Sequence, residues 1–93
     1  MLEKEIEKAL VKETKKLGGL CLKFTSPSMT GIPDRIILLP KEKIGFVETK
    51  RPGEKPRPIQ ENRIRQFKKL GFKVYVLDNK KDVDEILKEI GGD

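Results

Sequence analysis

The sequence predicts an α/β fold of one domain, with helices flanking a mixed four-stranded sheet and elements in the order α-β-β-β-α-β-α. Apolar residues recur at helical spacing in three segments: 2–17, 58–70 and 80–90. Short runs of aliphatic and aromatic residues lie in four others: 20–25, 34–39, 44–50 and 72–77. A chain of 93 residues is too short for two ordinary domains, so we expect a single domain over residues 1–93.

The first helix is predicted from one apolar face among glutamates and lysines. That face comprises Leu2, Ile6, Ala9, Leu10 and Leu17. Gly18 and Gly19 supply a stop for the helix. Residues 20–25 are apolar at alternate positions, which predicts the first strand.

The second strand, over residues 34–39, is aliphatic enough to be buried on both faces. Residues 40–43 turn the chain, and residues 44–50 return as the third strand. Short links of this kind join antiparallel neighbours, so we expect the first three strands to form a meander.

A proline-rich loop over residues 51–58 leads into the second helix, with Pro58 at a favourable first helical position. The expected apolar stripe of that helix consists of Ile59, Ile64, Phe67 and Leu70. A helix therefore joins the third strand to the fourth, over residues 72–77, so those two strands should be parallel. Asn79 is expected to cap the last helix, which Gly91-Gly92 ends.

Composition excludes several classes of chemistry. The chain has no histidine, which rules out Ser-His-Asp and Cys-His nucleophiles and every histidine-ligated metal site. Its one cysteine, Cys21, rules out an internal disulfide and a cysteine-cluster zinc site, and it suits a reducing cytoplasm. No apolar run approaches the length of a membrane span or signal peptide, so we expect an intracellular protein with no membrane partner.

The positive charge is unevenly distributed. The chain carries a net charge of +6, and residues 41–73 hold 11 Lys/Arg against 4 Asp/Glu, so this segment alone contributes +7. Such a concentration favours a polyanionic partner over general solubility. The ordinary alternative is a solvated basic surface.

Three ionisable residues gather where two neighbouring strands meet. Asp34 opens the second strand, while Glu48 and Lys50 share one face at the end of the third. Two carboxylates at one strand end bind a hard divalent cation such as Mg²⁺, which polarises a phosphodiester and activates water. A nearby lysine orients that water or stabilises charge on phosphorus. The ordinary alternative makes Asp34 a turn residue and the other two a same-face ion pair.

The pairing register of these strands decides whether the carboxylates meet. The simplest register places Leu39 opposite Ile44 and puts Asp34 opposite Thr49, on the wrong face. A shift of one residue, or a bulge, brings Asp34 level with the ionisable residues of the third strand. The sequence leaves both possibilities open.

These motifs, an aspartate after a proline and then a Glu-x-Lys at the end of the next strand, resemble the PD-(D/E)XK nuclease superfamily. The segments Gly31-Ile32-Pro33-Asp34-Arg35 and Phe46-Val47-Glu48-Thr49-Lys50, with Gln60 opening the next helix, resemble its VRR-NUC family. The resemblance covers residues from about 6 to 77. It is to the compact stand-alone form found in phages and prophages.

The resemblance implies a restriction-endonuclease-like core and a Mg²⁺-dependent endonuclease that hydrolyses DNA phosphodiesters, with Mn²⁺ able to substitute. It also implies a homodimer and favours structured substrates such as branched or four-way junctions. In this interpretation Asp34 and Glu48 bind the metal together with the backbone carbonyl of Thr49. Lys50 assists the attacking water.

Two further polar positions take roles from the resemblance. The first helix of the superfamily contributes a glutamate to the metal site, for which Glu7 is the leading candidate. Glu3, one turn earlier on the same face, is the second. Gln60 is either a polar residue touching solvent or a side chain that positions Lys50 or a phosphate, and the resemblance favours the second role.

Basic residues beyond the third strand are candidates for phosphate contacts that do not read bases. They are Arg51, Lys55, Arg57, Arg63, Arg65, Lys68 and Lys69. Not all of them can face one groove, because Arg65 and Lys68 lie one turn apart while Arg63 points elsewhere.

A second hypothesis keeps this basic segment, residues 51–73, and makes the protein a catalytically silent DNA-binding module. In either case we expect it in the cytoplasm of a bacterial host or phage-infected cell.

Overall fold

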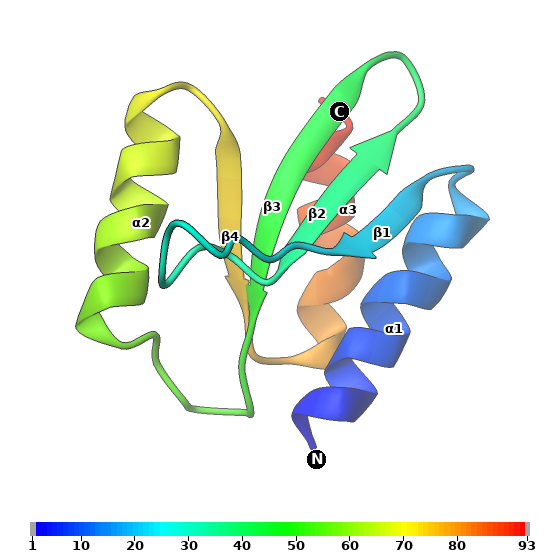
Figure 1. The fold of residues 1–93 in the computed structure, drawn as a ribbon. Helices are drawn as coiled ribbons and strands as arrows, with labels where there is room; N and C mark the ends of the chain where they lie inside the picture. Colours follow the sequence, from blue (N-terminus) through cyan, green and yellow to red (C-terminus); the bar gives the residue numbers. More distant parts are fainter. Residues whose placement is uncertain (1, 93) are drawn as a thin grey trace.

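The computed structural model describes residues 2–92 (Figure 1). Its helices and strands are α1 (Glu3–Lys16), β1 (Leu20–Lys23), β2 (Arg35–Leu39), β3 (Lys43–Thr49), α2 (Pro58–Lys69), β4 (Lys73–Leu77) and α3 (Val83–Ile90). The strands form one sheet in the order β1-β2-β3-β4. The first three are antiparallel neighbours, whereas β3 and β4 are parallel. The predicted fold class, element order and strand directions are confirmed.

Helices cover both faces of this sheet. α1 and α3 pack together on one face, and α2 lies on the other (Figure 1). The main core, under α1 and α3, consists of Ile6, Leu10, Ile37, Leu39, Val47, Leu77, Val83, Ile86, Leu87 and Ile90. A smaller cluster under α2 centres on Phe46, Ile64 and Val74. Gly45 lets α3 approach β3 closely, since a Cβ there would lie 2.6 Å from the Ile90 side chain.

β2 differs from the expectation that both its faces are buried. Arg35, Ile37 and Leu39 are buried on the α1/α3 face, whereas Ile36 and Leu38 are only half-buried. The reason is the position of α2, which packs over β4 and leaves the β2 part of its face thinly covered. The two faces of β2 therefore contribute unequally to the core.

Three leucines at helix ends are exposed. Leu17 and Leu70, predicted on apolar stripes, are 52% and 75% exposed. Both are C-terminal cap residues just beyond the last helical turn, and Leu2, at the N-terminal cap of α1, is likewise exposed. The stripe prediction is wrong at these positions because helical spacing no longer applies where the helix ends.

The hairpin between β2 and β3 departs from the simplest register. Leu39 pairs with Lys43 and not with Ile44. Lys41 and Glu42 both adopt left-handed backbone conformations, with φ of 66° and 62°, which closes a three-residue turn. Neither residue is the glycine or asparagine that normally marks such a conformation, so the sequence carries no local signal for it.

The register brings the two strand carboxylates level. Arg35 pairs with Val47, so Asp34, one residue before, lies beside Glu48. Of the two registers that the sequence left open, the chain adopts the shifted one and not the one with Asp34 opposite Thr49. Without this one-residue shift, Asp34 and Glu48 would point to opposite faces of the sheet and could not contribute to one carboxylate site.

The last helix begins later than expected. The Asn79 side chain accepts a hydrogen bond from the Lys81 N–H and caps a short 3₁₀ turn, Lys80–Asp82, which leads into α3. Asn79 thus caps that turn and not α3 itself.

Within residues 2–92 there is no helix with the length and apolar character needed to cross a bilayer.

Candidate active site

The predicted site residues converge where β2 begins and β3 ends, beside the first turns of α1 and α2 (Figure 1). Asp34 fixes its carboxylate there by accepting two hydrogen bonds from Thr49. The Thr49 backbone N–H donates to Oδ1 at 3.0 Å and its hydroxyl donates to Oδ2 at 2.6 Å. Asp34 is therefore held across the strand pair and is not a free turn residue.

Glu48 is the most buried acidic group of the site. It is 4% exposed, and its Oε2 accepts a hydrogen bond from Gln60 at 2.9 Å and lies 3.5 Å from the Lys50 ammonium. Its other oxygen, Oε1, is buried and has no hydrogen-bond partner within residues 2–92. Burial, reinforced by the nearby Asp34 charge, raises the pKa of Glu48 to about 7.

This raised pKa predicts a pH-dependent stability in the absence of divalent metal. The pKa of Glu48 in the folded state, about 7, exceeds the ordinary value of 4.5, so its contribution is complete below pH 4.5 and is lost as pH rises through 7. Relative to Glu48→Gln, the free energy of unfolding of the wild type in EDTA should fall by about 2–3 kcal/mol from pH 5 to pH 8. Urea denaturation of both proteins measures this difference. Parallel pH dependences would contradict it.

Gln60 connects α2 to the end of β3. Its side-chain oxygen accepts the Arg57 N–H at 2.9 Å, while its amide nitrogen donates to Glu48. Gln60 is buried, so it is not the solvent-facing residue of one interpretation. The second interpretation made Gln60 a side chain that positions Lys50 or a phosphate. In the structure its amide group contacts Glu48 and not Lys50.

A second group of carboxylates comes from α1. Carboxylate oxygens of Glu3, Glu7 and Asp34 lie within 4.8 Å of one another. Glu3 and Glu7 are one helical turn apart, which places both on the face of α1 that meets the start of β2. Burial and the charges of its two neighbours raise the pKa of Glu3. Glu48 lies outside this close group and faces α2.

Arg35 anchors the α1 carboxylates to the sheet. Its guanidinium donates to Glu7 Oε2 at 2.8 Å, from a buried position on β2. Sequence reasoning assigned no role to Arg35 and ranked Glu3 behind Glu7. The available signals were a charged residue, Arg35, at the start of an aliphatic strand and two acidic residues, Glu3 and Glu7, at helical spacing in the first helix.

The donor set suits a hard divalent cation. Carboxylate oxygens are the ligands that Mg²⁺ and Mn²⁺ prefer. Three carboxylates close together, and a fourth with a buried oxygen that lacks a partner, are the features that a cation would satisfy. Asp34 belongs to the first group and lies beside the fourth carboxylate, so it links the two.

The basic residues predicted to touch DNA are divided among surfaces. Arg63, Arg65 and Lys69 line one hollow of about 380 Å³ on α2, while Lys68 lines another, beside β4 and α3. The sequence predicted that Arg65 and Lys68 share a surface and that Arg63 lies apart from them. This prediction is wrong, because Arg65 shares a hollow with Arg63 and Lys68 lies on another. Arg63 also donates to the Thr30 carbonyl at 2.9 Å and so holds the loop before Asp34 against α2.

The remaining basic candidates lie on the loop between β3 and α2. Arg51 pairs with Glu54 at 2.8 Å, and Lys55 and Arg57 are exposed. This loop starts directly after Lys50. It therefore brings its cations nearer to the carboxylates than the far end of α2 can.

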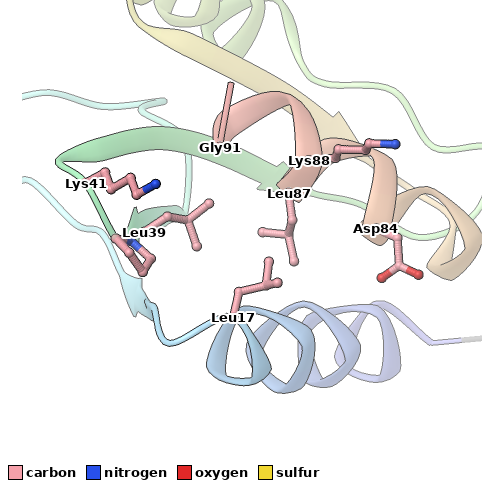
Figure 2. Close-up of a pocket in the computed structure, with 8 residues that line it drawn as sticks. Leu17, Leu39, Lys41, Asp84, Leu87, Lys88 and Gly91 are labelled. Carbon is pink, nitrogen blue, oxygen red and sulfur yellow. The ribbon is translucent and has the colours of Figure 1, made fainter. Parts of the chain in front are cut away.

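Another hollow, of about 430 Å³, lies between the end of α1, the β2–β3 turn and α3 (Figure 2). Leu17, Leu39 and Leu87 point into it, with Lys41, Asp84 and Lys88 at its margin (Figure 2). Neither Asp34 and Glu48 nor the α1 carboxylates Glu3 and Glu7 line it. It contributes nothing to the site.

Comparison with known proteins shows the family to which this fold belongs. Residues 1–81 match the family model described as "VRR-NUC domain". A protein named "Putative nuclease p44", from Acyrthosiphon pisum secondary endosymbiont phage 1, is 49% identical over 85 residues, covering 91% of this chain and 90% of that protein. A solved structure described as "VRR_NUC domain" superposes with a TM-score of 0.86 at 33% identity, covering 92% of this chain and 94% of the other. The chain belongs to the VRR-NUC domain family.

Proposed function

We propose that this member of a nuclease family is a Mg²⁺-dependent endodeoxyribonuclease, with Mn²⁺ able to replace Mg²⁺. One observation carries the proposal: the register of β2 and β3 brings Asp34 beside Glu48 and Lys50, next to the α1 carboxylates. Binding DNA alone requires no acidic cluster facing a polyanion. The arrangement therefore favours phosphodiester hydrolysis over a catalytically silent binding module.

Each residue takes a role from its position. Asp34 and Glu48 would hold the cation together with the Thr49 carbonyl, and Glu7, with Glu3 beside it, would complete the ligand set. When bound, the cation supplies charge stabilisation at the phosphate and lowers the pKa of its water. Lys50 holds the attacking water.

Two groups keep the ligands in place. Gln60 restrains Glu48 through the hydrogen bond to Oε2, which leaves Oε1 free. Arg35 restrains Glu7 in the same manner from β2. Supporting contacts of this kind fix a ligand's orientation and protonation state.

The substrate proposed is DNA, with branched structures such as four-way junctions favoured. Arg51, Lys55 and Arg57 would contact phosphates beside the site, and Arg63, Arg65 and Lys69 would extend that surface along α2. Lys68 would contact a phosphate from the separate surface beside β4 and α3. A two-fold homodimer would present two active sites to paired strands. A phage relative fits an enzyme acting in the cytoplasm of a bacterial host or phage-infected cell.

End-labelled linear, flap and four-way-junction DNA, incubated with Mg²⁺, Mn²⁺ or EDTA, test the proposal. We expect cleavage with either metal, none in EDTA, and faster cleavage of the branched substrates. Electrophoresis beside size markers measures the rate and position of each cut. Cleavage that persists in EDTA would contradict the metal dependence, and DNA binding without cleavage under all conditions would favour the silent module.

A further inference from the structure

A basic groove runs along α1 beside the edge strand β1. It has a volume of about 640 Å³. Its lining residues are Lys4, Glu7, Lys8, Val11, Lys12, Lys15, Lys23 and Arg35. Five lysines therefore face one hollow, four from α1 and one from β1.

The spacing of the lysines explains this convergence. Lys4, Lys8, Lys12 and Lys15 are separated by four, four and three residues, which places them on one face of a helix. The acidic residues of α1 are distributed differently: Glu3 and Glu7 belong to the carboxylate group, and Glu5 and Glu13 line a neighbouring hollow that Lys8 and Lys12 also border. One face of α1 therefore carries four lysines and one glutamate, Glu7.

The charge of the groove is not neutralised internally. None of its five lysines forms an ion pair with an acidic residue within residues 2–92, and all five are exposed. The single acidic group in the lining, Glu7, is paired with Arg35. Five positive charges without ion-pair partners in one concave surface contribute little to folding and favour the binding of an anion.

The groove is continuous with the carboxylate site. Glu7 and Arg35 belong to both, so the groove begins where Asp34 lies. From Lys4 to Lys15 the helix rises about 16 Å, at about 1.5 Å per residue. That length spans about five phosphates of one DNA strand, at about 3.4 Å of duplex axis each.

We propose that this α1–β1 groove carries the sugar–phosphate backbone of duplex DNA away from the active site, without base recognition. The inference rests on the proposed function, because it assumes that a phosphodiester lies at the carboxylates. It adds a contact surface on the side of the sheet opposite α2, formed by α1 and β1, whereas the sequence analysis had placed all the excess charge in residues 41–73. Lys8 and Lys12 are its central contacts.

The test is a salt titration of binding to a fluorescein-labelled duplex in EDTA, measured by fluorescence anisotropy. Lys8→Gln/Lys12→Gln should lower the slope of log affinity against log salt by about 1.8, since each phosphate contact contributes about 0.9. The control, Lys41→Asn/Lys88→Gln, removes two lysines that line the separate hollow of Figure 2. Asparagine tolerates the left-handed backbone at position 41. The control should keep the wild-type slope.

The outcomes separate this inference from the proposed function. The groove proposal is overturned if Lys8→Gln/Lys12→Gln keeps the wild-type slope of log affinity against log salt. It is also overturned if the control variant loses as much of that slope as the groove variant. Wild-type protein that binds DNA with the expected groove dependence but never cleaves it with Mg²⁺ overturns the nuclease proposal alone. Thermal melts of both variants, expected to match the wild type because the substituted lysines are exposed, confirm that lost binding is not lost folding.

Discussion

Replacing Asp34 with alanine is expected to lower the rate of DNA cleavage by several orders of magnitude and to leave DNA binding intact or tighter. Asp34 is the residue that joins the α1 carboxylates to the end of β3, so its loss divides the proposed ligand set. Binding should not suffer, because the change removes a negative charge near the phosphates. Cleavage assays and anisotropy on the same four-way junction measure both effects. Glu48→Ala should lose cleavage in the same manner.

A matched variant separates metal binding from structure. Asp34→Asn retains an oxygen that accepts the Thr49 N–H, so the strand contact survives while the charge is lost. It should be folded and as inactive as the alanine variant. Full cleavage by Asp34→Ala, from preparations free of contaminating nuclease, would remove Asp34 from the site.

Replacing Lys50 with alanine is expected to reduce the cleavage rate at saturating DNA by several orders of magnitude more than it reduces affinity. Lys50 lies beside the buried Glu48 carboxylate, where an ammonium assists water or the phosphorus charge mainly in the transition state. Single-turnover rates over a range of DNA concentrations separate the two effects.

Lys69→Ala is the matched control for Lys50. Lys69 is exposed on α2 and lies on the hollow shared with Arg63 and Arg65, away from the carboxylates. Its loss should weaken affinity modestly and leave the saturated rate unchanged. If Lys50→Ala behaves like this control, Lys50 is an ordinary phosphate contact.

The sequence was sufficient for the order and direction of the strands, because each depends on local patterns and on link lengths. It was not sufficient for the register of β2 and β3. That register depends on left-handed conformations at Lys41 and Glu42, which carry no local signature. The burial of one face of β2 against α1 and α3 selects a pairing that local sequence cannot.

The site was predictable in its chemistry and less so in its contacts. Asp34, Glu48 and Lys50 were identified from position on neighbouring strands, whereas the Arg35–Glu7 pair depends on how α1 docks. The α1 lysines were missed for a different reason. Summed charge along the chain cancels Lys against Glu in α1, whereas the helix places four of its lysines and only one glutamate on one hollow.

The carboxylate site has a consequence for when activity can arise. The pairs Arg35–Glu7, Thr49–Asp34 and Gln60–Glu48 close chain separations of 28, 15 and 12 residues, and no helix or hairpin alone contains all of them. Such contacts form only after the entropy of closing those loops has been offset by the packed core. A nascent or partly unfolded chain therefore holds the proposed ligands apart and, on the proposed function, is inactive. On the proposed function, cooperative folding would itself protect the DNA of a cell that synthesises this protein from premature cleavage.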